Sequence, residues 1–336
     1  MLQLLALSLL PPSDPTDSPL ALDPAPSLLA RVPAAPLRWN HGPGTSGGGS
    51  LTSSGETLRA GRWSFELRSD WTEFEHVSVA EAEAEAIAND EFDALESSWV
   101  NSFELSYGLT DDLQLGIVLG YYAGSNFIDA EADGLGGAES ATADPSGMTD
   151  TWVTAKWRVM HGQTGHLALL GGVKLPTGKD DETLSNGEEL EPSSQPGSGS
   201  VDYQAGVAYS RFLTSRVTVD ASGIYTVRTE HDDFEVGDRA DLGLALAYRL
   251  TEDVRAPNNW SVFGELNGVW LDEDVEDGTS NENSGGETLY LTLGVRDRFD
   301  EHFSLSLAPA VPIYQDANGD QVETEWRVGL ALTYTL

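Results

Sequence analysis

Histidines and carboxylates are the residues of this chain best suited to catalysis. Of its six histidines, His231 is followed directly by Asp232 and Asp233. A histidine beside carboxylates can activate water against a peptide bond. The same three residues also fit a solvated acidic turn, because no matched second acidic pair accompanies them. A Ser-His lipase would need both groups on the lipid side of one strand region, and no segment offers that.

Cysteine is absent from the sequence. Thiolate metal sites, cysteine nucleophiles and disulfides are therefore excluded. We expect no catalytic residue and no cofactor, and a hydrolase that uses His231 stays open as a third functional hypothesis.

Two acidic stretches could contribute oxygen ligands to a divalent cation. They are residues 272–278 and 316–320, and carboxylates of this kind suit Ca²⁺ or Mg²⁺. Neither matches the spacing of a calcium-binding EF-hand loop. Asn318-Gly319 is instead typical of a hairpin turn. Weak binding of divalent cations by loops stays open, and no metal ligand is assigned.

Charge is distributed very unevenly along the chain. Its 18 Lys and Arg against 55 Asp and Glu give a net charge of −37, which would repel nucleic acid. More than half of the acids, but only one basic residue, Lys179, fall in six long polar links. These links are residues 75–96, 124–147, 177–199, 229–238, 272–286 and 316–321.

Between the links, apolar and polar residues alternate with period two in twelve segments of residues 59–336. Leu242, Leu244, Leu246 and Tyr248 show the pattern especially clearly. Each segment has roughly 10 to 13 residues, and a tilted membrane-spanning strand needs about 9 to 11. Long links alternate with short ones near residues 109–112, 160–165, 213–215, 251–258 and 299–302.

This order predicts a twelve-stranded antiparallel transmembrane β-barrel in the outer membrane, with long acidic external loops and short periplasmic turns. The strand count is even, so both termini fall on the side of the short turns. No apolar run approaches the ~20 residues that a membrane-spanning helix needs. The last segment ends at Leu336, whereas such barrels usually end in Phe.

Charged residues within the strands share the face opposite the apolar one. A lipid-facing Arg or Lys at mid-bilayer costs about 2 to 4 kcal/mol, so we predict that these residues line a polar lumen. They are Arg62, Glu66, Arg68, Glu104, Lys156, Arg158, Lys174, Asp202, Asp220, Arg228, Asp241, Arg249, Glu265, Arg296 and Arg327. Tyr122, Trp152 and Tyr290 occupy the same alternate positions of their strands, so they too are predicted to face the lumen.

The chain begins with two segments that lack the strand pattern. Residues 1–10 are apolar and resemble a secretory signal without its positively charged start. Residues 11–58 are rich in Pro, Gly and Ser and cannot bury enough apolar area to fold alone. We predict a flexible periplasmic segment that could plug the barrel mouth.

Two motifs resemble an outer-membrane family. Residues 175–179 read Leu-Pro-Thr-Gly-Lys, and residues 196–206 begin with Pro-Gly-Ser-Gly. They resemble the transporters grouped under the MetA pathway of phenol degradation, in which one strand ends in Leu-Pro-Thr-Gly and the next begins at a Pro-Gly-Ser-Gly turn. The resemblance implies an outer-membrane channel for hydrophobic or aromatic small molecules. Turn geometry alone also explains these residues.

Two functional hypotheses of different class follow. The first is a channel that passes small solutes through a narrow lumen, because twelve strands lie between the eight of filled barrels and the sixteen or more of open porins. The second is a non-conducting structural or adhesion barrel with acidic surface loops. The expected partners are outer-membrane lipid and a small solute, without nucleic acid.

Overall fold

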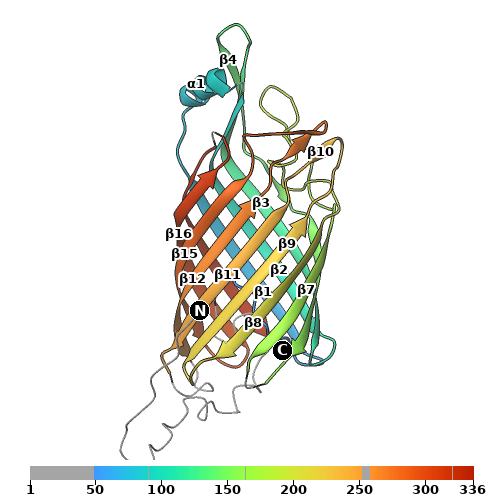
Figure 1. Ribbon diagram of the computed structural model, residues 1–336, viewed down its shortest axis with the longest axis vertical. Helices are drawn as coiled ribbons and strands as arrows, with labels where there is room; N and C mark the ends of the chain where they lie inside the picture. The colour runs from blue at the N-terminus through green and yellow to red at the C-terminus, as the bar shows by residue number, and fades with distance from the viewer. Residues whose placement is uncertain (1–48, 90, 163, 252–257, 320) are drawn as a thin grey trace, which may run out of the picture.

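The computed structural model describes residues 49–89, 91–162, 164–251, 258–319 and 321–336. The signal-like segment 1–10 and most of the predicted flexible segment 11–58 lie outside the described residues. The described chain is a tall antiparallel barrel with loops extended at one end and tight turns at the other (Figure 1).

Twelve long strands form the wall of the barrel. They are β1 (Trp63–Phe74), β2 (Glu91–Gly108), β3 (Leu113–Ala132), β6 (Thr151–Met160), β7 (His166–Leu175), β8 (Tyr203–Phe212), β9 (Val217–Val227), β11 (Arg239–Arg249), β12 (Asn259–Leu271), β15 (Gly286–Arg298), β16 (Phe303–Ala317) and β17 (Thr324–Thr335). The loops hold the helix α1 (Val79–Asn89) and the short strands β4 (Ala138–Ala143), β5 (Ser146–Met148), β10 (Phe234–Glu235), β13 (Val275–Glu276) and β14 (Thr279–Ser280).

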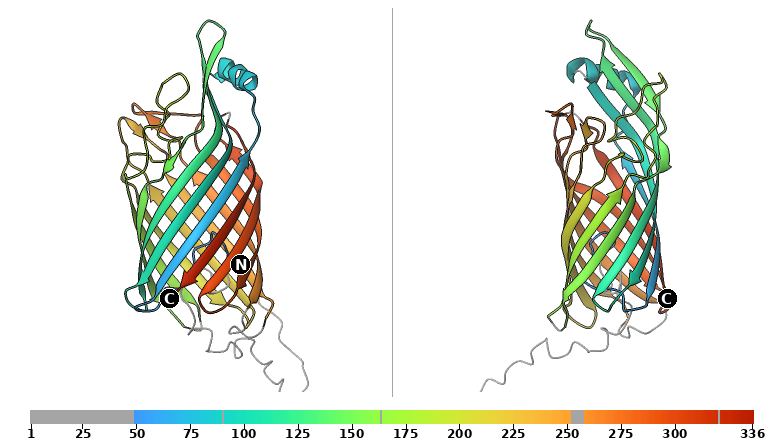
Figure 2. Two further views of the ribbon diagram at one scale, coloured as in Figure 1. Left: turned by 180° about the vertical axis from the view of Figure 1, so that it is seen from behind. Right: turned by 90° about the vertical axis from the view of Figure 1, so that its right-hand side faces the viewer.

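Each wall strand pairs antiparallel with its neighbours in the chain, and the first strand closes the ring on the last. β1 pairs with β17 over a register that places Leu67 opposite Leu332. β2 pairs with both β1 and β3. The views from behind and from the side show the strands tilted around a closed wall (Figure 2). The predicted twelve-stranded barrel is confirmed.

The two faces of the wall differ in chemistry. On β11, the side chains of Leu242, Leu244 and Leu246 are 63%, 50% and 54% exposed on the outside, while Ala245 and Ala247 between them are buried. Such a belt of large apolar side chains is stable only against hydrocarbon. Aromatic residues also lie outward, among them Trp63, Trp99, Trp157, Trp260 and Trp326, as in the aromatic girdles of membrane barrels.

The long loop 75–96 contains the helix α1. The Glu-Ala alternation of residues 81–86 fits either a short helix or a strand extension, and a capping box explains why it is a helix. The Ser78 main-chain N–H donates to the Glu81 carboxylate at 2.9 Å, and Glu81 N–H donates to Ser78 Oγ at 3.4 Å. Ala82 and Ala86, four residues apart, are buried against the apolar residues of β2 and β3. No helix in the described part of the chain is long and apolar enough to cross a membrane.

The segment 124–147 was expected to be a loop, but most of it is strand. β3 continues to Ala132, where it pairs with β4 and with the beginning of β2. Together β2, β3 and β4 rise above the rim beside α1 (Figure 1). Above the rim neither face meets lipid, because α1 covers one face of these extensions and the β7–β8 loop contacts the other. The alternation that marks a lipid-facing strand is therefore missing from the sequence.

We predict that Leu244→Arg, at the middle of β11, destabilises the barrel by about 2 to 4 kcal/mol, because the charge would face the centre of the hydrocarbon. Reversible unfolding of the protein in liposomes measures this. Tyr248→Arg, at the periplasmic end of the same strand, is the matched control and should cost only about 0 to 1 kcal/mol. Equal effects at the two depths would contradict the assignment of the belt.

Candidate functional site

The predicted lumen residues other than Arg62 lie on the wall strands or next to the strand ends. They are all buried or half-buried. Arg62 precedes β1 and is exposed at the periplasmic end, so it does not belong to the lumen wall. The remaining residues form three levels, which are a periplasmic level, a middle level and a level near the external loops.

At the periplasmic level, Arg158 closes the turn between β2 and β3. Its Nη2 donates to Asp112 Oδ1 at 2.7 Å and to the Asp111 carbonyl at 2.8 Å. This hydrogen bond holds the pKa of Asp112 below its ordinary value. Arg249 similarly donates to the Ser215 carbonyl at 3.0 Å. The inward arginines at this level therefore stabilise the short turns.

At the middle level, residues 49–58 run inside the barrel. We name this stretch the luminal segment. Thr52, Ser54, Glu56, Thr57 and Leu58 are all buried within it. Its contacts reach strands on different sides of the wall, because residues of β1, β3, β8, β9, β12 and β15 bond to it. It therefore crosses the lumen.

Glu265 of β12 is the principal anchor of the luminal segment. It is only 1% exposed. Its carboxylate accepts the main-chain N–H groups of Ser50 at 2.9 Å and Leu51 at 3.0 Å, together with that of Thr52. Asn267 donates a further hydrogen bond at 3.0 Å. Successive main-chain N–H groups converging on one carboxylate form an anion-binding nest.

Basic and polar groups bond the rest of the luminal segment. Arg68 Nη1 donates to the Ser50 carbonyl at 3.1 Å, and Arg296 Nη2 donates to the Gly49 carbonyl at 2.7 Å. Ser210 Oγ accepts the Gly55 N–H at 2.8 Å. A cavity of about 300 Å³ remains between this segment and the wall. Its charged lining residues are Glu66, Arg68, Glu104, Lys156 and Arg296.

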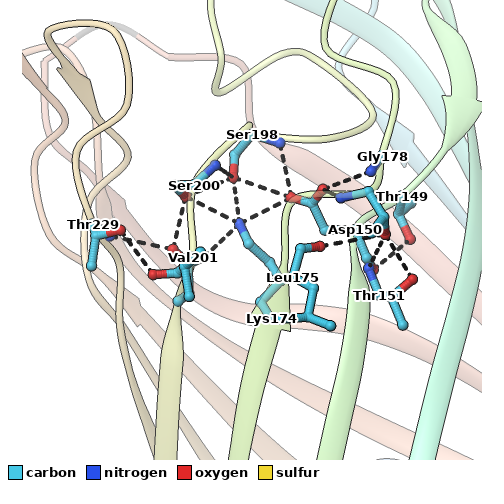
Figure 3. A network of polar contacts seen from close by, with 12 residues as sticks. Thr149, Asp150, Thr151, Lys174, Leu175, Gly178, Ser198, Ser200, Val201 and Thr229 are labelled. Carbon is cyan, nitrogen blue, oxygen red and sulfur yellow. Dashed lines mark hydrogen bonds and ion pairs between the residues drawn. The ribbon is translucent and has the colours of Figure 1, made fainter.

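Near the external loops, Lys174 is the centre of a buried ionic network (Figure 3). Its ammonium lies 2.5 Å from Asp202 Oδ2 and 3.2 Å from Asp150 Oδ2, and it also bonds to Ser198. The side chains of Lys174 and Asp202 are 11% and 2% exposed. One buried ammonium between two buried carboxylates neutralises one of the two negative charges, and the neighbouring hydroxyl and main-chain N–H groups bond to the carboxylate oxygens.

The two family motifs meet in this network. Asp150 Oδ1 accepts the N–H groups of Thr177 and Gly178, while its Oδ2 accepts that of Ser198 (Figure 3). A Cβ at Gly178 would lie 2.7 Å from the Cα of Gly197, so only glycine allows the two turns to pack. The motifs therefore hold the β7–β8 loop against β6, with Asp150 as the common acceptor of both turns.

A second cavity of about 400 Å³ lies below this loop. Trp152, Lys174, Arg228, Arg239 and Asp241 contribute to its lining. Arg239 pairs with Asp241 at 2.7 Å.

The other aromatic residues of luminal parity are also enclosed. Tyr290 is 7% exposed, and the guanidinium of Arg327 lies 3.6 Å from the centre of its ring. Tyr122 is half-buried.

Asp220, another predicted lumen residue, is buried and accepts a hydrogen bond from Ser210.

The catalytic and cation candidates of the sequence form turns. His231 Nε2 lies 3.4 Å from Asp232 Oδ2 in an exposed position, and Asp232 and Asp233 have positive φ. Residues 272–278 contain β13 and the turn before β14, where Asp277 and Gly278 have positive φ. Residues 316–320 include the end of β16, and Asp320 lies outside the described residues.

We predict that Lys174→Met destabilises the protein by about 3 to 5 kcal/mol, because it leaves Asp150 and Asp202 buried without their common counter-charge. Lys179→Met is the control, since its pair with Glu182 is partly exposed and should contribute only about 0 to 1 kcal/mol. Unfolding midpoints of both variants in detergent micelles test this. Equal stability of the two variants would exclude a structural role for the network.

Solved structures of other barrels resemble this fold. The chain is similar to an outer membrane channel from Pseudomonas putida F1, with a TM-score of 0.56 and 16% identity over 83% of this chain and 97% of that chain. It is also similar to the NanC porin, with a TM-score of 0.46 and 8% identity over 81% and 100%. The transport unit of the autotransporter AIDA-I from Escherichia coli has a TM-score of 0.46 and 11% identity over 82% and 90%.

The sequence comparison gives the family. A search of curated proteins finds no match to this chain. The family described as "Putative MetA-pathway of phenol degradation" matches residues 97–296, which is more than half of the chain. The resemblance carried by the two turn motifs is thereby confirmed. The chain is an outer-membrane β-barrel and belongs to the MetA-pathway family of phenol degradation.

Proposed function

We propose that the barrel is an outer-membrane channel that passes small hydrophobic or aromatic solutes through a narrow lumen. The observation that carries the proposal is the pair of cavities, about 300 and 400 Å³, enclosed by a polar inner wall. A barrel that served only as an anchor would have no need of hollow interior space lined by charged residues. Family membership supports the same function.

The lining of the lumen supports a solute with an aromatic ring. Trp152 of β6 lines the cavity of about 400 Å³, and Tyr290 of β15, on the opposite part of the ring of strands, presents its ring to Arg327. Aromatic faces bind other rings by offset stacking, and guanidinium groups bind ring faces and carboxylates. A lumen with both would favour aromatic acids and phenols over saturated alkanes.

We further propose that the luminal segment is a plug that sets the resting conductance. Its main chain bonds to Glu265, Arg68 and Arg296 across the middle of the lumen. The same side chains would be free to meet a solute when the segment is displaced. Opening would therefore exchange bonds to the segment for bonds to water or solute.

The alternative function is a non-conducting structural or adhesion barrel with acidic external loops. The luminal segment favours it in one respect, because a segment bonded to several strands could seal the lumen permanently. Single-channel recording in planar bilayers separates the two functions. Current through the correctly folded full chain supports the channel, and a silent wild type together with silent plug variants would reject it.

A liposome-swelling screen tests the solute class. Aromatic acids and phenols should enter faster than sugars of equal size. A rate that follows molecular size alone would leave a channel but overturn the preference for aromatic rings.

We predict that Glu265→Gln raises the open probability or the conductance of the channel. Loss of one charge-assisted hydrogen bond costs about 1.5 kcal/mol, which raises the population of the displaced segment by roughly tenfold. Glu104→Gln is the matched control, since it also removes one carboxylate charge from the inner wall, at the cavity that the luminal segment lines, whereas Glu104 bonds to Ser106 of its own strand. If the two variants conduct alike, the anchoring role of Glu265 is wrong.

A further inference from the structure

Three carboxylates from distant parts of the chain meet at the external end of the barrel. Glu91 and Asp93 lie in the part of β2 that rises above the rim, and Glu191 lies in the loop between β7 and β8. Each offers one ligand atom, and these atoms all lie within 4.8 Å of one another. In the described part of the chain, they are the one group of three acidic or histidine residues that meets this spacing.

Asp93 gives a second, independent reason to expect a ligand. Its Oδ1 is buried and has no hydrogen-bond partner among the described residues. Phe92 and Phe127, which lie on opposite faces of the β2–β3 extension, are also buried. A carboxylate oxygen that is withdrawn from water needs a donor or a cation, because leaving it bare costs free energy.

The charged groups closest to the three carboxylates are also acidic. Burial and the neighbouring carboxylates of Glu91, Glu276 and Asp274 raise the pKa of Glu191 to about 7. Arg228 and Arg239 also line the adjoining cavity of about 460 Å³, but Arg239 is already paired with Asp241, and only acidic groups contribute to the charge interactions of Glu91, Asp93 and Glu191. The three carboxylates thus face one another without a basic side chain to separate them.

We propose that Glu91, Asp93 and Glu191 bind one divalent cation of the calcium class and thereby fasten the β7–β8 loop to the β2 extension. Carboxylate oxygens are the ligands that Ca²⁺ prefers, and its flexible coordination can be completed by water from the adjoining cavity. Mg²⁺ demands stricter octahedral geometry and gives up its water reluctantly, so it should bind more weakly. The proposal does not depend on conduction.

The test is calcium binding by the full chain, folded in detergent micelles and measured by titration calorimetry near neutral pH and at physiological ionic strength. We expect one saturable Ca²⁺ per chain above the diffuse binding that the acidic loops give. Glu191→Gln and Asp93→Asn should each weaken it by about tenfold or more, because the number of charged ligands sets the affinity.

Glu188→Gln is the matched control, since Glu188 lies in the same loop and is exposed. It should bind Ca²⁺ as the wild type does. Limited proteolysis gives a second readout, in which Ca²⁺ should protect the β7–β8 loop of the wild type and of Glu188→Gln, but not that of Glu191→Gln. Folding of each variant is checked by its heat-dependent mobility in gel electrophoresis.

If Asp93→Asn fails to fold, Glu191→Gln decides, because its change lies in a loop. The proposal is overturned if Glu191→Gln binds Ca²⁺ as tightly as Glu188→Gln does. It is equally overturned if the wild type shows only non-saturable binding that salt removes.

Discussion

The absence of hydrogen-bonding partners in hydrocarbon is the constraint on which this structure depends. Every main-chain N–H and C=O within the membrane must be paired by the protein itself. The pairing of β1 with β17, together with that of β2 with β3, leaves no open edge in the ring of twelve strands. A closed wall then forces alternate side chains to opposite solvents, lipid outside and a confined aqueous space inside.

Confinement explains how the inner charges are arranged. Side chains two residues apart on one strand share a face, and Arg68–Asp70 and Arg239–Asp241 are pairs of this kind. Lys174 is instead shared by Asp150 and Asp202 of the β5–β6 and β7–β8 connections. Local pairing of this sort lowers the cost of holding many ionised groups in a narrow lumen.

The strands could be predicted from the sequence because the membrane imposes a local rule on them. The twelve segments, the order of their links and the outward leucines of β11 all follow from period-two alternation. Helix α1 and the extensions of β2 and β3 obey no such rule, since they pack on one another and on the β7–β8 loop and not against lipid. The contact of Glu91 with Glu191 also cannot be predicted from the local sequence, because it depends on how the β2 extension and the β7–β8 loop fold at the rim.

The luminal segment shows why poor folding propensity can be informative. Its Gly- and Ser-rich sequence cannot bury enough apolar area to order itself. Inside the barrel, small size is what the position requires. A Cβ at Gly49 would lie 2.6 Å from Glu265 Oε1, and one at Gly55 would lie 2.3 Å from the His166 carbonyl. Larger side chains would keep the segment from reaching Glu265. The small residues that prevent the segment from folding alone therefore allow it to enter the barrel, where the wall supplies its hydrogen-bond partners.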